Sequence, residues 1–326
     1  MDNLLKDYLL NIETVSPQEF KNMSVIGLKT PLQNDLEFLS LEDALKEDLI
    51  TITEVDKSGT VPDLKAINRA IIPVLLLDGE ELVGAKQNRV LNTSILLKEN
   101  SEFVVPVSCT EEGRWSYKSA EFADSKHLAS SRVRRAKSAS VNFSLKNSRE
   151  YRSDQSEVWE EIRQTHNRSG ENSSTGALRD AYTSQEKHLA EYIEAFPLQE
   201  GQNGIIVIIN GQVMGMEILY NHTKYSNYHE KLVKSYALDA LLQENQSNNS
   251  FTVKKFIKTI TLSEQASYPS IGYGEDYRFE NDYSVGSSLV WDGNIIHTAF
   301  FKKPEIDEKC PVKLTSASAR ARYRVN

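Results

Sequence analysis

The sequence predicts an α+β protein in which two lobes rich in antiparallel strands are joined by a helical segment. Two observations carry this prediction. Apolar runs separated by Asp-Gly or Asn-Gly, the dipeptides that favour β-hairpin turns, occur toward both ends of the chain. Between them, apolar residues recur at the three- and four-residue spacing of amphipathic helices. The lobes are expected over about residues 20–145 and 200–303, with the helical stretch at 153–197.

Three turn signals mark the expected hairpins. Asp78-Gly79, Asn210-Gly211 and Asp292-Gly293 each lie between two apolar runs. Because these residue types tolerate positive φ angles, each pair suits a type I′ turn. Further strands are expected, from their β-branched and apolar residues, at 24–28, 50–55, 94–97 and 103–107.

Helices are predicted from apolar periodicity and from capping residues. At the N-terminus, Leu5, Tyr8, Leu9 and Ile12 recur at helical spacing, which indicates an amphipathic helix. Ser40 precedes acidic residues and is expected to cap a short helix. This and the later helices are expected at 41–49, from 153 or 154 to about 170, 183–196 and 228–242. The whole chain is expected to divide into an N-terminal β-rich lobe (1–145), a helical and C-terminal α+β unit (150–303) and a tail (304–326).

Composition bounds the class of protein. The 326 residues are 39% hydrophobic and 26% charged, with only 15 Gly and 9 Pro, which excludes collagen-like and linker-like chains. The net charge of −8 disfavours a general binder of nucleic acid or anionic lipid. No apolar stretch approaches the ~20 residues that span a bilayer, and no signal peptide is recognisable. We expect a cytoplasmic protein whose two cysteines, Cys109 and Cys310, are reduced.

Four consecutive polar side chains, Lys86, Gln87, Asn88 and Arg89, follow Gly84-Ala85 in a segment expected to be a strand. Lys and Arg suit phosphate or carboxylate, and amides can bind bases or ribose hydroxyls. The segment indicates either an anion-binding site or a solvated edge strand. Unless Gly84-Ala85 introduces a bulge or twist, strand geometry favours Lys86 facing the ligand beside Arg114, with Arg89 on the opposite face in a structural ion pair.

A second cluster follows the strand expected at 103–107. Glu111 and Glu112 are followed by Arg114 and Trp115. Trp can stack on a base or a guanidinium, and either acid can serve as a general base or pair with Arg114. The preceding Cys109 has no base nearby in sequence, so a small buried apolar role is favoured over that of a nucleophile.

Residues 114–152 are strongly basic within an acidic chain, with ten Lys or Arg and three Asp or Glu. Such a block indicates an anionic ligand, nucleic acid included, an ion-paired contact with an acidic face elsewhere in the chain, or a solvated loop. Near the C-terminus, Glu275 and Asp276 precede Arg278, and His297 lies in an expected strand, where a lone His is more often structural. The chain has no P-loop, Gly-x-Ser-x-Gly, His-Glu-x-x-His or Cys-x-x-Cys motif, and no metal or cofactor is assigned.

These motifs together resemble the ARPP-type domain, the ADP-ribosylglycohydrolase- and rhodanese-phosphatase-superfamily-associated protein domain. The resemblance covers about residues 20–300. It is carried by Asp78-Gly79-Glu80, Gly84 to Arg89, Pro106 to Cys109, Glu111-x-Gly113-Arg114-Trp115, Asp154-Gln155, Val158-Trp159, Gly274-Glu275-Asp276-x-Arg278 and His297. The resemblance implies a role in bacterial conflict or nucleotide signalling. It also favours ADP-ribose or a related nucleotide as the ligand.

Two functions from different classes follow. In the first, the chain binds or processes an anionic nucleotide or ADP-ribose derivative. Glu80 or Glu111 would be the general base, and the ligand would contact Lys86, Gln87, Asn88, Arg89, Arg114, Trp115, Arg278 and His297. In the second, the same Arg- and Trp-rich residues form the interface of a non-catalytic scaffold with a protein partner. Convergence of the cationic residues on one concave pocket would favour the first.

Overall fold

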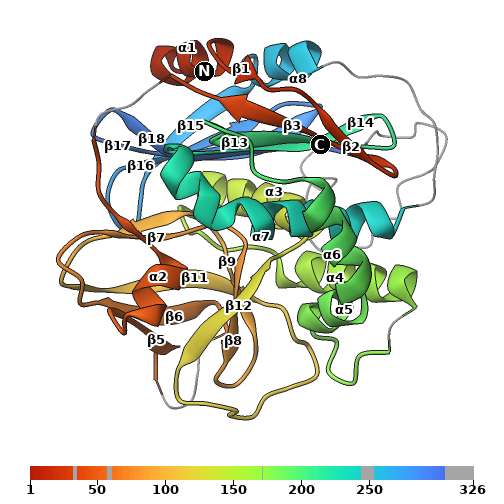
Figure 1. Cartoon of the computed structure of the whole chain (residues 1–326). Coiled ribbons are helices and arrows are strands. Elements are labelled where there is room, and N and C mark those ends of the chain that lie inside the picture. Colours follow the sequence, from red (N-terminus) through yellow and green to blue (C-terminus); the bar gives the residue numbers. More distant parts are fainter. Residues whose placement is uncertain (32–34, 57–60, 171, 244–252, 305–326) are drawn as a thin grey trace, which may run out of the picture.

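The computed structural model describes residues 1–31, 35–56, 61–170, 172–243 and 253–304. Within these ranges the strands form a nine-stranded, a six-stranded and a three-stranded sheet, and all paired strands are antiparallel except β4 and β7. Figure 1 shows the large sheet above a layer of helices, with the smaller sheets below. The predicted α+β class is confirmed.

The nine-stranded sheet combines both ends of the described chain. Its strand β3 (Met23–Lys29) pairs with β13 (Gly204–Ile209), so residues that the sequence assigns to the N-terminal lobe complete the sheet of the C-terminal half. The other strands are β1 (Glu13–Thr14), β2 (Gln18–Phe20), β14 (Gln212–Leu219), β15 (Glu264–Pro269), β16 (Glu275–Glu280), β17 (Ser284–Trp291) and β18 (Asn294–Lys302).

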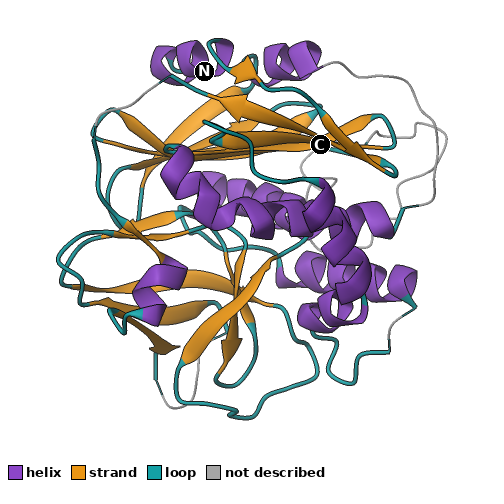
Figure 2. Cartoon of the chain, in the orientation of Figure 1, coloured by secondary structure: helices purple, strands orange, loops and turns teal. Residues whose placement is uncertain are grey.

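Both faces of this sheet are covered by helices because its central strands are apolar on both sides. In β13, Ile205 and Val207 pack toward α3 (Ser131–Ser148) and α7 (His222–Leu241), whereas Ile206 packs toward α1 (Asn3–Leu10) and α8 (Val253–Ile260). Figure 2 shows these two helical layers on opposite sides of the sheet. The alternation is the period of two expected of a strand.

The lower part of the molecule is built from short strands between residues 39 and 128. The six-stranded sheet contains β12 (Phe122–Leu128), β8 (Glu80–Gly84), β9 (Arg89–Leu91), β11 (Ser101–Cys109), β6 (Asp63–Asn68) and β5 (Ile50–Glu54). The three-stranded sheet contains β10 (Ile95–Leu97), β7 (Val74–Leu76) and β4 (Leu39–Ser40), next to α2 (Leu41–Lys46). The predicted cap of α2 is confirmed, because the Ser40 hydroxyl accepts the amide N–H of Asp43.

Two of the three predicted hairpins are confirmed. Asn210-Gly211 joins β13 to β14 and Asp292-Gly293 joins β17 to β18, each pair with the positive φ angles of a type I′ turn. The prediction for Asp78-Gly79 is wrong, because β7 and β8 leave this turn into different sheets. Gly79 has a φ of +86°, and a Cβ there would lie 2.2 Å from Cδ of Arg134, so the turn needs glycine to receive that side chain.

The helices in the middle of the chain lie largely where the apolar periodicity of the sequence predicts them. The helix α4 (Gln155–Ser169) is capped by Asp154 and ends at Gly170, as predicted. The helix expected at 183–196 is divided into α5 (Leu178–Ser184) and α6 (Glu186–Ala195). Figure 1 places α4 and α5 beside the six-stranded sheet, which creates the surface on which the candidate site lies.

The basic segment contains the helix α3, which the sequence analysis missed. Three of its cations are paired within the molecule: Arg134 with Glu217, Lys137 with Asp78 and Arg135 with Glu161. Ser130 caps the helix, and small or charged residues take up much of its buried face, so its apolar periodicity is weak. Of the roles considered for this segment, the structure shows the ion-paired contact within the chain.

Candidate functional site

Residues 85–88 form the connection between β8 and β9 and are not part of a strand. Gly84 and Ala85 have positive φ angles of +132° and +36°, so the chain turns sharply where a continuous strand is expected. Lys86 and Arg89 consequently do not lie on opposite faces of one strand. Nζ of Lys86 and Cζ of Arg89 lie 5.1 Å and 5.8 Å from the centroid of the Trp115 ring.

Arg114 holds this turn in place. The guanidinium donates through Nε to Oε2 of Glu111 (2.9 Å) and through Nη2 to Oδ1 of Asn88 (3.1 Å) and the carbonyl oxygen of Gly84 (3.2 Å). Its Nη1 donates to the carbonyl oxygens of Ala85 (2.7 Å) and Ser116 (2.8 Å). The side chain is buried. These contacts use every nitrogen of the guanidinium, so Arg114 organises the two loops of the site and is poorly placed to hold a phosphate.

Arg89 is fully buried beneath Trp115. Its Nη1 donates to Oε1 of Gln87 (2.9 Å) and to Sγ of Cys109 (3.0 Å), and its Nη2 lies 3.8 Å from Oε1 of Glu54. Burial raises the pKa of the Cys109 thiol to about 11, which leaves it protonated and unreactive at neutral pH. Cys109 is reduced and unpaired, and Cys310 lies outside the described residues.

Trp115 and Tyr117 form an exposed aromatic pair at the edge of the site, with 49% and 54% of their surfaces exposed. The ammonium of Lys86 lies over both rings, 5.2 Å from the centroid of Tyr117. Lys86 therefore makes cation–π contacts within the loop pair and lies on the side of the turn where these rings are exposed.

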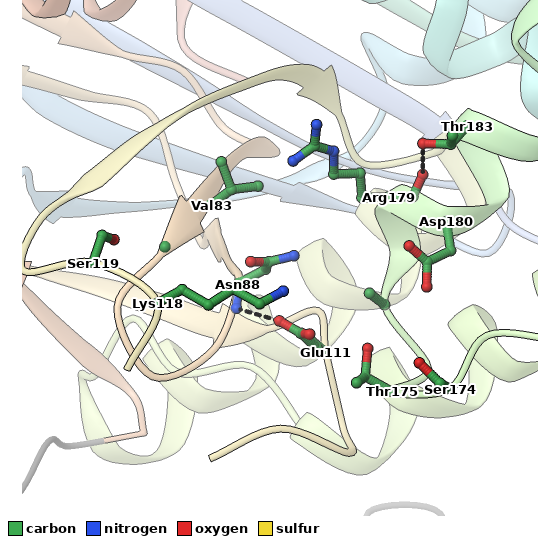
Figure 3. A pocket seen from close by; sticks show the side chains of 12 residues that line it. Val83, Asn88, Glu111, Lys118, Ser119, Ser174, Thr175, Arg179, Asp180 and Thr183 are labelled. Carbon is green, nitrogen blue, oxygen red and sulfur yellow. Dashed lines mark hydrogen bonds between the residues drawn. The ribbon is translucent and has the colours of Figure 1, made fainter. Parts of the chain in front are cut away.

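A cavity of about 570 Å³ opens between the β8–β9 turn and α5 (Figure 3). Asn88, Glu111 and Lys118 line one wall, and Thr175 and Asp180 lie across from them. The cavity is completed by Val83, Gly84, Ser119, Ser174, Ala177, Arg179 and Thr183. Its lining offers cations, carboxylates and hydroxyl groups, the groups that bind phosphates and sugar hydroxyls.

Thr110 fixes the two walls of the cavity to each other. Its amide N–H donates to the carbonyl oxygen of Asn88 (3.0 Å), and its own carbonyl oxygen accepts the amide N–H of Leu178 at the start of α5 (2.9 Å). Gly113 N–H also donates to the carbonyl oxygen of Thr175 (2.7 Å). These backbone bonds hold α5 against residues distant in sequence, so the cavity exists only in the folded chain.

The structure brings together only some of the predicted site residues. Of these, Asn88 and Glu111 line the cavity, and Arg114 donates a hydrogen bond to Asn88 from behind its wall. Lys86, Gln87, Arg89 and Trp115 cluster on the other side of the turn. The sequence did not predict Lys118 and Arg179, the cations of the cavity, because each is an exposed cation without a local pattern that distinguishes it.

Three predicted residues lie away from the cavity in buried polar networks. Glu80 accepts the amide N–H of Leu77 and pairs with Lys231 of α7, 3.3 Å away. Arg278 pairs with Asp276 and donates to Thr93, whereas His297 bridges Ser94 (2.8 Å) and Glu217 (3.2 Å). The last two networks join the nine-stranded sheet to the segment between β9 and β10, which is a structural role.

Glu111 and Glu80, the two predicted general bases, have pKa values shifted in opposite directions. Burial alone would raise the pKa of Glu111, but hydrogen bonds from Arg114, Thr175 and the Asn88 amide together hold it below its usual value. Burial raises the pKa of Glu80 to about 7 against the charge of Lys231. Glu111 is thus an ionised carboxylate that these donors stabilise, which makes it a weak base.

Within the described residues, no cluster of three or more His, Cys, Asp or Glu side chains is arranged to hold a metal ion. None of the described helices combines the length and apolar character needed to cross a membrane.

The comparison with protein families identifies the chain. The model of the ARPP-1 family, described as the ARG and Rhodanese-Phosphatase-superfamily-associated Protein domain, matches residues 11–301. The chain therefore belongs to this family, and the resemblance seen in the sequence is confirmed. No curated protein and no solved structure matches the chain.

Proposed function

We propose that the chain binds an anionic, hydroxyl-rich small molecule, a nucleotide or ADP-ribose, in the cavity between the β8–β9 turn and α5. The observation that carries this proposal is the placement of Lys118 and Arg179 around one cavity together with Asn88, Asp180 and Thr175. Lys118 and Arg179 supply charge for a diphosphate, and the amide, carboxylate and hydroxyl groups supply partners for ribose hydroxyls. The family description, which links the domain to ARG proteins, is consistent with such a ligand.

The proposal is for binding and does not include catalysis. Oε2 of Glu111 is held by Arg114 and the Asn88 amide, and Glu80 lies in a separate buried network with Lys231. The cationic residues that the sequence analysis grouped together do not converge on one pocket. A setting in bacterial conflict or nucleotide signalling, which the family resemblance suggests, is compatible with a ligand-sensing module of this kind.

Replacing either cation of the cavity is expected to weaken the ligand. A charge-assisted contact contributes about 1.5–3 kcal/mol, so Lys118→Ala and Arg179→Ala should each reduce affinity for ADP-ribose by roughly 10–150-fold. The measurement is calorimetric titration with ADP-ribose and with ADP. Lys187→Ala, which removes an exposed lysine of α6 outside the cavity, is the matched control and should bind like the wild type. Wild-type protein that binds neither ligand at millimolar concentration contradicts the proposal.

The exposed pair Trp115 and Tyr117 favours a second candidate, a protein-interaction module. The same titration separates the two. If Trp115→Ala leaves ADP-ribose binding unchanged and Lys118→Ala abolishes it, the aromatic pair is not part of the ligand site. If the wild type binds no nucleotide, the scaffold function becomes the better account.

A further inference from the structure

A buried carboxyl group, Glu81, lies behind the wall of the cavity. Side chains alternate along β8, so Glu81 points to the same face as Val83, which lines the cavity. Glu81 is completely buried. Its Oε1 accepts the hydroxyl of Thr110 at 2.7 Å, and its Oε2 has no hydrogen-bond partner among the described residues.

The charged and titratable groups that act on Glu81 come from two parts of the chain. Arg179 and Tyr182 approach from α5, and Glu111 follows β11. Burial raises the pKa of Glu81 to about 7, although the hydrogen bond from Thr110, the nearby hydroxyl of Ser125 and the charge of Arg179 oppose the rise. Tyr182 stays neutral because burial raises its pKa well above the usual value, and Glu111 stays ionised.

Arg179 therefore belongs to two interactions at once. It lines the cavity, where the proposed function gives it an anionic partner, and its charge acts on the carboxyl group of Glu81. A phosphate bound at Arg179 would offset the positive charge that favours ionised Glu81. The Thr110 hydroxyl donates to Glu81, and the Thr110 backbone is hydrogen-bonded to both walls of the cavity. These bonds hold the Glu81 carboxyl next to the cavity.

We infer that Glu81 couples anion binding to proton uptake: it takes up a proton from solvent when the anionic group of a ligand binds at Arg179. This inference rests on the proposed function of the cavity. By linkage, a ligand that favours protonated Glu81 must itself bind more tightly when Glu81 is protonated. Affinity should consequently fall by about fivefold as pH rises from about 6 to 8 if binding raises the pKa of Glu81 by one unit.

ADP-ribose is a suitable probe because both of its phosphates are esterified and neither titrates near pH 7. His127, which lies near Arg179, does not interfere, because burial lowers its pKa to about 3 and it stays neutral in this range. Any proton taken up near neutral pH then reports on the protein, and Glu81 is the buried carboxyl on which the charge of Arg179 acts.

The test is calorimetric titration with ADP-ribose at pH 7 in two buffers of different ionisation enthalpy. Wild type is expected to take up a fraction of a proton per ligand bound. Glu81→Gln, which keeps an acceptor for Thr110, should bind ADP-ribose without proton uptake and with an affinity that no longer depends on pH. Glu161→Gln removes a partly buried carboxyl whose pKa burial also raises, outside the cavity, and should behave like wild type. Binding without proton uptake in wild type, or unchanged uptake in Glu81→Gln, overturns the inference and leaves the proposed function standing.

A second measurement needs no ligand. Carbon-13 NMR of the glutamate carboxyl groups follows the titration of Glu81, assigned from its absence in Glu81→Gln. Arg179→Ala removes the same charge that a bound anion would offset, so it should raise the titration midpoint of Glu81. An unchanged midpoint overturns the inference whether or not ADP-ribose binds.

Discussion

Arg134→Met is expected to lower the free energy of unfolding by about 3–5 kcal/mol, because breaking a buried ion pair leaves an uncompensated charge. Arg134 is fully buried and donates to Glu217 (2.5 Å), Ser235 (3.0 Å) and the carbonyl oxygen of Ala129 (3.0 Å). It also packs against Gly79, so it joins the nine-stranded sheet to the lower sheets. Urea denaturation measures the loss.

A second substitution separates the effect of the unpaired charge on the free energy of unfolding from the effect of lost packing. Adding Glu217→Gln to Arg134→Met removes the stranded charge but keeps an acceptor for the hydroxyl of Tyr236. The double variant should regain at least about 1 kcal/mol relative to Arg134→Met. A double variant less stable than Arg134→Met would show that packing, and not the unpaired charge, dominates. Arg168→Ala, at an exposed position of α4, is the control and should change stability by less than about 0.5 kcal/mol.

Arg114→Ala is expected to lower the free energy of unfolding by about 2–4 kcal/mol, since it removes the guanidinium that pairs with the buried carboxylate of Glu111. It also leaves the carbonyl oxygens of Gly84 and Ala85 without the donor that closes the turn. The sequence alone predicts a different result, a loss of ligand affinity through a lost phosphate contact. Chemical denaturation beside calorimetric titration distinguishes the two.

The control for Arg114 is Arg152→Ala, which removes an exposed arginine whose partner Glu150 is also exposed. It should leave stability within about 0.5 kcal/mol of wild type. If Arg114→Ala unfolds like wild type but binds ADP-ribose far more weakly, Arg114 is a ligand residue and the structural role assigned to it is wrong.

Local signals in the sequence predicted much of the fold. The turns at Asn210-Gly211 and Asp292-Gly293 and the caps at Ser40 and Asp154 depend on residues within a few positions of each other, and the structure confirms them. Asp78-Gly79 has the same local chemistry, yet its flanking strands enter different sheets. The strand with which a given strand pairs depends on residues that are distant in sequence. The Asp-Gly dipeptide therefore could not predict the pairing.

The helix α3 was missed for a related reason. Its buried side includes Arg134, Lys137 and Ser138, which do not give an apolar periodicity. Their burial is possible because Glu217 and Asp78, far away in sequence, supply the opposite charges. The sequence pattern of such a basic helix cannot be distinguished from that of a basic loop until those acidic partners are known.

The candidate site was predicted in part. The turn at 84–89 and the Glu111 to Trp115 segment are neighbours in the structure, as their shared polar character suggested, and Asn88 and Glu111 do line the cavity. The opposite wall comes from α5, which backbone bonds to Thr110 and Gly113 hold in place. Such bonds carry no side-chain signature, so Arg179 could not be associated with Asn88 from the sequence.

The central claim is that an anionic nucleotide ligand occupies the cavity between the β8–β9 turn and α5. A crystal structure of the wild-type protein grown with ADP-ribose tests it most directly. The account predicts density for the ligand in this cavity, with its diphosphate within ion-pair distance of Lys118 or Arg179 and a ribose hydroxyl near Asp180 or Asn88. Ligand bound elsewhere, for example stacked on Trp115 with the cavity empty, would contradict it.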